Sequence, residues 1–182
     1  VALARNIGYV PKSRKAAMAT VSFDVDTSEI NPSPSTITLK KGVVASSTGG
    51  FAGQSFVFSI LEDVTVPVFD GVATFNELPI HEGVLLESNF TKSSRNLNQK
   101  YILPNAGIDT DLIRVTVRSS EFSTAATKYS LQDSLFEINP ESKVYYLQEI
   151  SDERYELIFG DGVFGQALEE GAYVTANYIV TN

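Results

Sequence analysis

Short runs of β-branched and aromatic residues, separated by turn residues, make up most of the chain after residue 19. They recur roughly every 8 to 12 positions, a spacing typical of antiparallel β proteins. Almost no helical periodicity follows residue 20, so the chain is predicted to be mainly β, built as antiparallel β-sandwich or open-barrel units. The predicted strands are Thr20–Asp26, Thr36–Leu39, Val43–Ser46, Ser55–Leu61, Val64–Phe69, Val72–Phe75, Val84–Phe90, Lys100–Leu103, Leu112–Arg118, Lys143–Gln148, Tyr155–Phe159 and Tyr173–Val180.

The first residues of the chain follow a different pattern. Leu3, Ile7 and Val10 recur at helical spacing. After a proline, residues 13–19 are rich in helix formers. We therefore expect a short N-terminal helix within an arm formed by residues 1–19.

A polar stretch near the middle of the chain divides the predicted strands into two groups. Residues 91–98 are polar, and Pro104-Asn105-Ala106-Gly107 follows soon after, which is typical of a linker. This predicts a first β unit over residues 20–92 and a second over residues 99–182. The second unit is expected to end in a Phe-Gly-Asp-Gly hairpin.

Glycines near the end of the chain spell the Gly-x-Gly-x-x-Gly pattern of a dinucleotide-binding loop, at Gly160, Gly162 and Gly165. That loop requires a helix directly after it, whose N-terminus holds the pyrophosphate. Only residues 166–170 lie before Gly171, and the residues beyond alternate like a strand. Because no room is left for the helix, we reject the dinucleotide interpretation.

The same glycine-rich segment is predicted to be the turn of a hairpin. Asp-Gly between two apolar runs is a strong short-range hairpin signal. Strand Tyr155–Phe159 would reverse at Gly160-Asp161-Gly162 and return as strand Tyr173–Val180. The residues expected to have a structural role in this turn are Gly160, Asp161, Gly162 and Gly165.

Charge is distributed unevenly along the chain, whose net charge is −8. Its first 15 residues contain Arg5, Lys12, Arg14 and Lys15 and no acidic residue, which leaves 10 of the 14 basic residues against all 22 acidic ones. Such an acidic body repels phosphate backbones, so we expect no nucleic-acid partner. The four basic residues are a candidate interface with an acidic neighbouring protein.

Composition limits the other classes of protein to which the chain could belong. A chain of 182 residues with 43% hydrophobic content can bury a real core. The lack of cysteine removes disulfides and thiol nucleophiles. No run of about 18 apolar residues is present, so we expect no membrane partner. The chain lacks an initiator methionine and starts within an apparent helix, which indicates a fragment of a longer polypeptide.

No catalytic or metal-binding motif is complete in the sequence. Asp24-Val25-Asp26-Thr27-Ser28 has the first spacings of a calcium loop, but Glu29 stands where glycine is needed. His81 is the sole histidine and Gly-x-Ser-x-Gly is absent, so neither a zinc protease pair nor a serine triad can form. We therefore expect no enzyme, cofactor, metal or small-molecule substrate. A carboxylate enzyme remains an alternative, because paired acids such as Glu62-Asp63 and Glu169-Glu170 can serve a glycosidase.

Several stretches, taken in order, carry a resemblance to a known protein family. The most specific is the run Tyr155–Gly165, with Gly171 and Asn177-Tyr178 behind it. The others are Ala4–Tyr9 with Ala16-Ala17, Ile37–Gly42 with Phe56–Phe58, Glu82-Gly83, and Gln99–Pro104 with Ile108-Asp109. Together they resemble the baseplate J-like proteins of contractile-tailed phages, particularly as found in the baseplate wedge subunit of T-even-like myophages.

This resemblance implies a structural tail protein without catalytic residues. Such proteins build the wedges of the baseplate, pair with other wedge subunits and with themselves, and help to form the ring that transmits the trigger for sheath contraction. It also implies assembly in the host cytoplasm and a final location in the virion tail. The alternative from another class is a carbohydrate-binding β-sandwich of a tail fibre or adhesin, which predicts exposed aromatic platforms.

Overall fold

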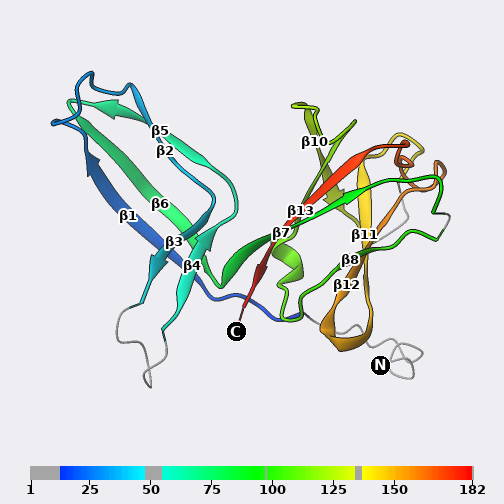
Figure 1. Cartoon of the computed structure of the whole chain (residues 1–182). Coiled ribbons are helices and arrows are strands. Elements are labelled where there is room, and N and C mark those ends of the chain that lie inside the picture. Colours follow the sequence, from blue (N-terminus) through cyan, green and yellow to red (C-terminus); the bar gives the residue numbers. More distant parts are fainter. Residues whose placement is uncertain (1–12, 48–54, 97, 134–136, 182) are drawn as a thin grey trace.

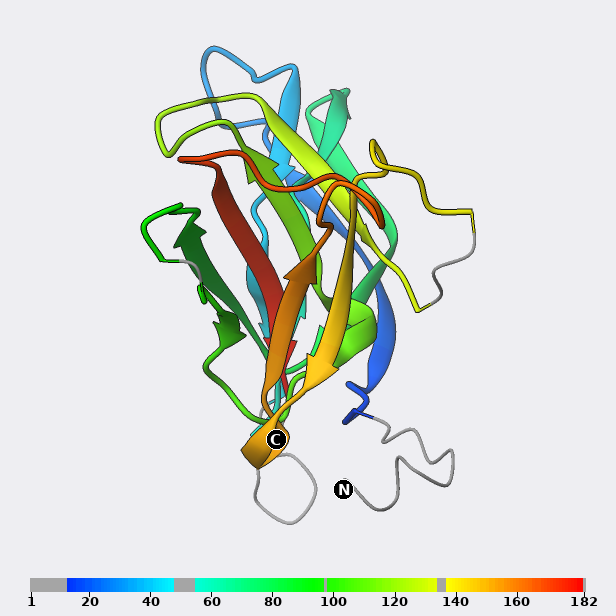
Figure 2. The same cartoon turned by 90° about the vertical axis from the view of Figure 1, so that its right-hand side faces the viewer.

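The computed structural model describes residues 13–47, 55–96, 98–133 and 137–181, which form two β-sheets (Figure 1). The first sheet is an extended arm, and the second curls into a nearly closed barrel (Figure 2). The arm contains β1 (Met18–Asp26), β2 (Thr36–Leu39), β3 (Gly42–Ser46), β4 (Val57–Ile60), β5 (Val64–Phe69) and β6 (Val72–Glu82). The barrel contains β7 (Val84–Thr91), β8 (Tyr101–Leu103), β9 (Arg114–Arg118), β10 (Ala126–Leu131), β11 (Val144–Glu149), β12 (Tyr155–Phe159) and β13 (Tyr173–Val180). Two short 3-10 helices, η2 (Thr110–Leu112) and η3 (Ser151–Glu153), lie in its connections.

The structure confirms a mainly β fold with antiparallel sheets. Among the described strands, neighbours pair antiparallel except β10 and β11, which run parallel with Ser130 opposite Val144. β10 lies in a segment for which the sequence predicted no strand. Its alternation is weak, and the strand forms because β9 and β11 supply hydrogen-bond partners on both of its edges.

The expected N-terminal helix is absent from the described residues, and this prediction needs correction. Residues 13–17 have no helical structure and lead directly into β1, which begins at Met18. Residues 1–12, where the rest of the helix was predicted, lie outside the described residues. Strand pairing overrides the helix propensity here, because Ala19 is paired with Ile80 of β6.

β6 is the central strand of the arm. β1 pairs with one of its edges along the whole length, from Met18 opposite His81 to Asp26 opposite Val72. β5 and β4 share the other edge, β5 at the Val72 end and β4 at the His81 end. β2 and β3 extend the sheet beyond them. The arm is therefore a forked sheet whose stem is the pair of β1 and β6.

Little of the arm is buried. Its core consists of Ile60, Leu78 and Ile80, surrounded by partly buried apolar residues of β1 to β5. Nearer the tip, Phe23 stacks on Phe75 with the ring centroids 4.9 Å apart. Most residues of β1 remain exposed. Buried and exposed residues alternate along much of β6, so one face of this strand is covered within the arm, and the arm projects from the barrel (Figure 1).

The barrel encloses the larger core. Its fully buried side chains include Leu103, Ile108, Tyr145, Leu157, Val174 and Tyr178. β7 and β8 stand at the two ends of its strand order. Phe90 of β7 and Tyr101 of β8 meet edge to face, with ring centroids 5.6 Å apart. These two aromatic side chains thus cover the gap between β7 and β8, which are not paired through their backbones.

The change from arm to barrel occurs earlier than the sequence indicated. Residues 84–91 were assigned to a first unit ending at residue 92. They form β7, and every residue of this strand pairs with β13 in the barrel. The polar stretch that followed is the connection from β7 to β8, within one sheet. The chain instead passes between the sheets at Gly83.

Gly83 approaches the last barrel strand so closely that no side chain fits. A Cβ atom at this position would lie 2.4 Å from the carbonyl oxygen of Val180, and the backbone has φ +118°. The Gly83 carbonyl accepts a hydrogen bond of 2.8 Å from the buried Ser59 hydroxyl. Its amide donates to the carbonyl of Val57 at 2.9 Å. These contacts fix the direction in which the arm leaves the barrel.

Exposed polar contacts add to this junction. Lys41 of the arm lies with its Nζ 2.8 Å from Asn177 Oδ1 and 3.2 Å from Glu87 Oε2, both on the barrel. Lys128 of β10 reaches Glu62 of the arm at 2.8 Å. Exposed ion pairs of this kind contribute at most about 1 kcal/mol each. Their role is to orient the two sheets rather than to hold them together.

Replacing Gly83 by alanine is expected to lower the free energy of unfolding more than the same change at Gly42. The two glycines have φ of +118° and +120°, so the strain of the backbone, about 1–3 kcal/mol, is common to both variants. A Cβ at Gly42 meets nothing within 4 Å, whereas one at Gly83 overlaps Val180. Urea unfolding of the two variants measures the difference, and equal losses would contradict the close approach.

Candidate protein interfaces

The Phe-Gly-Asp-Gly segment forms a compact loop after β12. The Oδ1 atom of Asp161 accepts hydrogen bonds of 2.9 Å from the amides of both Val163 and Phe164. The amide of Gly162 donates to the carbonyl of Gly165 at 3.0 Å. Aspartate favours turns of this kind because its short side chain can accept bonds from its own backbone neighbours. All four residues predicted for the turn lie in this loop.

The strands on either side of the loop do not pair, so the predicted hairpin is wrong. β12 pairs with β11 and β8, whereas β13 pairs with β7 and β9. Three strands separate β12 from β13 in the strand order. Residues 160–172 instead cross one end of the barrel before β13 begins (Figure 2). The Asp-Gly signal is local and locates a turn, but it does not specify the partner of the next strand.

Glycine at position 160 allows the loop to close on itself. A Cβ on Gly160 would lie 2.2 Å from the carbonyl carbon of Gly165. Gly160 also forms an isolated bridge with Ala167. The tight closure leaves Val163 and Phe164 on the outside, where they are 60% and 46% exposed. The loop thus presents two adjacent apolar side chains on a constrained backbone, which suits it to a protein contact.

The hydrogen bonds of this loop depend on the charge of its carboxylate. Backbone amides, first that of Phe164 and then that of Val163, hold the pKa of Asp161 below its ordinary value. Because the folded-state pKa is lowered, the stabilisation is complete above the ordinary pKa of aspartate. It is lost as the pH falls through the lowered pKa.

Asp161→Ala is expected to speed the amide hydrogen exchange of Val163 and Phe164, since both amides lose their acceptor. Asp161→Asn keeps one carbonyl oxygen and should retain more of the protection from exchange. This protection should not change as the pH falls, because an amide side chain does not titrate. NMR exchange rates, corrected for the intrinsic effect of pH, measure this for the wild type and both variants. Equal rates in the wild type and Asp161→Ala would show that the carboxylate does not hold the loop.

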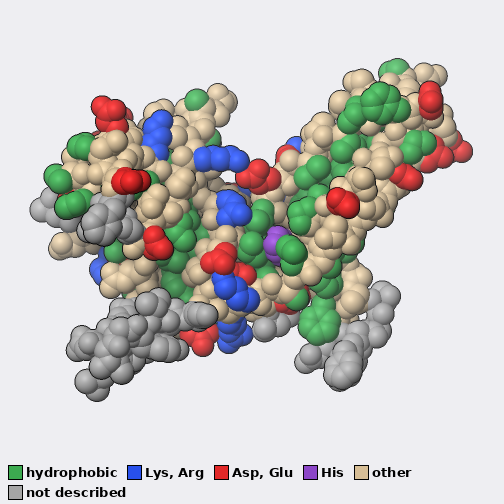
Figure 3. Space-filling view, turned by 180° about the vertical axis from the view of Figure 1, so that it is seen from behind, with side chains coloured by type: hydrophobic (Ala, Val, Ile, Leu, Met, Phe, Trp, Pro, Cys, Tyr) green, Lys and Arg blue, Asp and Glu red, His purple; other side chains and the backbone are tan. Residues whose placement is uncertain are grey.

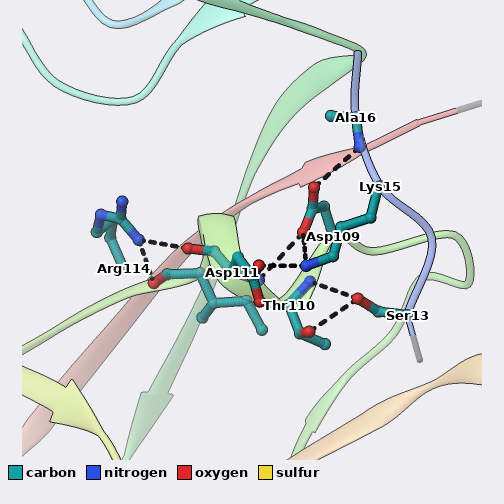
Figure 4. Close-up of polar contacts among 8 residues, drawn as sticks. Ser13, Lys15, Ala16, Asp109, Thr110, Asp111 and Arg114 are labelled. Carbon is teal, nitrogen blue, oxygen red and sulfur yellow. Dashed lines mark hydrogen bonds and ion pairs between the residues drawn. The ribbon is translucent and has the colours of Figure 1, made fainter. Parts of the chain in front are cut away.

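The segment that leads into the arm is fixed to the barrel by a buried carboxylate (Figure 4). Asp109 is 3% exposed, and its Oδ2 atom accepts a hydrogen bond of 2.9 Å from the amide of Ala16. Its Oδ1 atom accepts one of 3.1 Å from the amide of Asp111, and the Nζ atom of Lys15 lies 3.4 Å from that oxygen. One side chain therefore joins residues that are far apart in the sequence.

Two further contacts support this attachment. The amide of Thr110 donates to the Ser13 hydroxyl oxygen at 3.2 Å, and the two hydroxyl groups lie 2.8 Å apart. Lys15 forms a second ion pair with Asp111, and this hydrogen bond is the main reason that the pKa of Lys15 is raised. The positive charge of Lys15 is thus engaged within the chain.

The basic residues proposed as an interface have different positions in the structure. Arg5 and Lys12 lie outside the described residues. Lys15 is occupied by Asp109 and Asp111. Arg14 is 51% exposed at its side chain and lies 3.3 Å from an exposed carboxylate of η3. The two side chains are about equally exposed, and they differ in their partners, because Lys15 lies beside the buried Asp109 whereas the carboxylate beside Arg14 is itself exposed.

Asp109→Ala is expected to lower the free energy of unfolding by about 1–3 kcal/mol, because the amides of Ala16 and Asp111 lose their buried acceptor. Asp111→Ala is the matched control. It removes the exposed partner of Lys15 and is expected to cost less than about 1 kcal/mol. Urea unfolding measures both variants, and equal effects would mean that Asp109 is not the anchor.

The distal arm, defined as residues 18–39 and 64–82, is acidic. Neither segment contains lysine or arginine. The exposed carboxylates are Asp24, Asp26, Glu29, Asp70 and Glu77. In Figure 3 the arm extends to the upper right, with acidic side chains among hydrophobic ones. At its tip, Phe69 and Val72 are 73% and 37% exposed on either side of a tight turn. The sequence predicted no interface here, although both segments can be recognised by their lack of basic residues.

Among the described residues, no group of three or more His, Asp or Glu side chains could hold a metal ion. Asp24 accepts a hydrogen bond of 2.7 Å from Thr74, and Asp26 accepts one of 2.8 Å from the amide of Ser28. Burial lowers the pKa of His81. No helix in the described part of the chain is long and apolar enough to span a bilayer.

The described residues form a β-structural protein with exposed apolar and charged side chains on its arm and its glycine-rich loop. The barrel supplies a rigid body, and the arm and the glycine-rich loop project from it. Residues 88–181 match the family described as bacteriophage baseplate wedge protein gp6, third domain. This match covers more than half of the chain, so the chain belongs to that family. A comparison with curated proteins finds no match.

The family match follows the barrel closely. It begins within β7 and ends directly after β13, so it spans the barrel strands, whereas the arm precedes it. Membership gives the chain a structural role in the phage tail baseplate and a location in the virion tail. It also implies contacts with other baseplate subunits. The expectation of a baseplate wedge protein is confirmed at this level.

Proposed function

We propose that the chain is a rigid spacer in a baseplate wedge, and that it binds neighbouring wedge subunits through its distal arm and its glycine-rich loop. The coincidence of the family match with the barrel carries this proposal. The barrel has a buried core and fixes the direction of the arm through Gly83. A force applied to the distal arm would therefore be passed to the glycine-rich loop, because no flexible linker separates the arm from the barrel. This property suits a protein that helps to pass on the trigger for sheath contraction.

The finer assignment is to the baseplate J-like type of T-even-like myophages. It is supported by the ordered resemblance that ends in Tyr155–Gly165, a segment that forms a closed loop in the structure. In this proposal the protein assembles in the host cytoplasm and also binds copies of itself. The net charge of −8 supports protein partners rather than nucleic acid or anionic membranes.

A contact between the basic N-terminal residues and an acidic neighbour is part of the same proposal. Arg14 is the residue on which it is best tested, because its only ion pair among the described residues is with an exposed carboxylate. Lys15 is unsuited, since its substitution would also disturb the attachment to Asp109. Exposed basic residues elsewhere, such as Arg95, provide a control for a nonspecific effect of charge.

The full-length protein is expected to be present in purified phage tails. In a phage whose gene for this protein is inactivated, wild-type protein supplied from a plasmid should restore tail assembly. Arg14→Glu should reduce its incorporation, because it places a carboxylate against an acidic neighbour, whereas Arg95→Glu should not. Immunoblots of purified tails give the amounts incorporated.

Two outcomes of this experiment contradict different parts of the proposal. Absence of the wild-type protein from tails would overturn the structural function as a whole. Incorporation of Arg14→Glu at the level of Arg95→Glu would remove the N-terminal contact alone. The carbohydrate-binding alternative predicts hits on a glycan array, and it would replace the present proposal if such hits accompanied absence from tails.

A further inference from the structure

β1 has a long edge that no other described strand covers. It pairs with β6 alone, over its full length. The carbonyl of Ala17 accepts a hydrogen bond from the amide of Glu82. In an antiparallel pair, the backbone groups of successive residues point alternately toward the partner strand and away from it. The backbone groups of Met18 and Thr20 therefore point away from β6. Thr20 lies opposite Pro79, which has no amide to donate, in agreement with this alternation.

The same alternation resumes after a bulge in the ladder. The register shifts between Val21 and Phe23, and beyond it the amide of Thr27 donates to the carbonyl of Gly71 at 2.7 Å. The backbone groups of Asp24 and Asp26 consequently also point outward. Backbone amides and carbonyls that point away from β6 thus occur at both ends of β1. An added strand would need these groups as its hydrogen-bond partners.

The first part of the exposed edge, before the bulge, lacks the features that usually block strand addition. Met18–Asp26 contains no lysine, proline or glycine. Its first part, from Met18 to Val21, has no charge, and Met18 is 66% exposed. β1 lies along the outer side of the arm (Figure 1). The edge is therefore open to another extended chain.

Charge selects the kind of chain that this edge can accept. The distal arm has only acidic charges at its surface, and Asp24 and Asp26 lie on β1 itself. Two copies joined edge to edge at β1 would bring these acidic arms together, which is unfavourable. A segment with lysine or arginine would instead be attracted and would fix its register against the two carboxylates.

We propose that β1 accepts an extended, basic segment of a neighbouring wedge subunit as an added β-strand. This proposal rests on the proposed function, since it names the partner chemistry of the arm. The outward backbone groups supply the hydrogen bonds and the carboxylates supply selectivity. At the same end of the arm, Val72 of β6 lies opposite Asp26 and Phe69 of β5 lies opposite Val72, so exposed apolar residues are next to the acidic end of β1.

Thr20→Pro is the sharpest test, because it removes one outward amide and leaves the ladder with β6 intact. Thr20→Val is its matched control, since it keeps the amide and has nearly the same shape. Asp24→Lys with Asp26→Lys tests the selection by charge. Its control is Glu121→Lys with Glu141→Lys, which makes the same change of charge on exposed barrel loops.

Each variant is made in the full-length protein and supplied to the phage that lacks it, and its amount in purified tails is measured against the wild type. Thr20→Pro and the double lysine variant are expected to fall about tenfold, while both controls stay near the wild type. Thermal unfolding by circular dichroism verifies that the variants fold. Incorporation of Thr20→Pro at the level of Thr20→Val would overturn the proposal.

Hydrogen exchange read by mass spectrometry provides a second, independent readout. The outward amides of β1 should exchange rapidly in the free protein and become protected in assembled tails. Unchanged exchange across 18–26 in tails that contain the protein would overturn the strand addition while leaving the proposed function intact. If the free protein is a dimer that Thr20→Pro separates, the occupant is a second copy and the basic partner is excluded.

Discussion

The packing of Gly83 against Val180 is the constraint on which the shape of the protein depends. β6 and β7 follow one another directly in the chain, yet they belong to different sheets because the backbone bends at this glycine. Buried polar groups hold both sides of the bend. Ser59 donates to the Gly83 carbonyl, and Thr181 donates to the carboxylate of Glu82. Without this junction each sheet would keep its own hydrogen bonds, but the arm would have no fixed direction.

Burial divides the molecule into two parts with different uses. The barrel buries large aromatic and aliphatic side chains, so its strands are held from the inside and its position in a larger assembly can be rigid. The arm buries few residues and gains little from the hydrophobic effect, so its strands depend mainly on the ladder around β6. The same lack of cover leaves its carboxylates and the edge of β1 available to other proteins.

Local patterns explain how much of the fold could be predicted. The bounds of β2, β5, β12 and β13 agree with the expected strands, because each is an apolar or β-branched run that ends at turn residues. β10 was missed because its sequence, Ala126–Leu131, has little signal of its own and is paired on both sides. The N-terminal helix was wrong over the described residues, since strand pairing and the contact of Ala16 with Asp109 outweigh helix propensity.

The candidate interfaces were predictable to a smaller extent. Asp161 and its glycines lie together in one loop, which is closed by hydrogen bonds between near neighbours in the sequence. The charge of Lys15 appeared free in the sequence, but it is paired with residues more than 90 positions away. No local pattern records such a pair. The exposure of the Phe69 tip was likewise hidden, because an apolar residue in a strand is read as part of a core.

The sequence by itself determined the β class, the positions of most strands and turns, the acidic character of the body, and a resemblance that leads to the baseplate wedge family. These follow from local periodicity, turn chemistry and composition, which need no knowledge of distant contacts. Only the tertiary structure decided that β12 and β13 are separated, that the sheets change at Gly83, and that β1 keeps an open edge. Each of these is a pairing between distant segments, and such pairing is settled by the competition of all strands for partners in three dimensions.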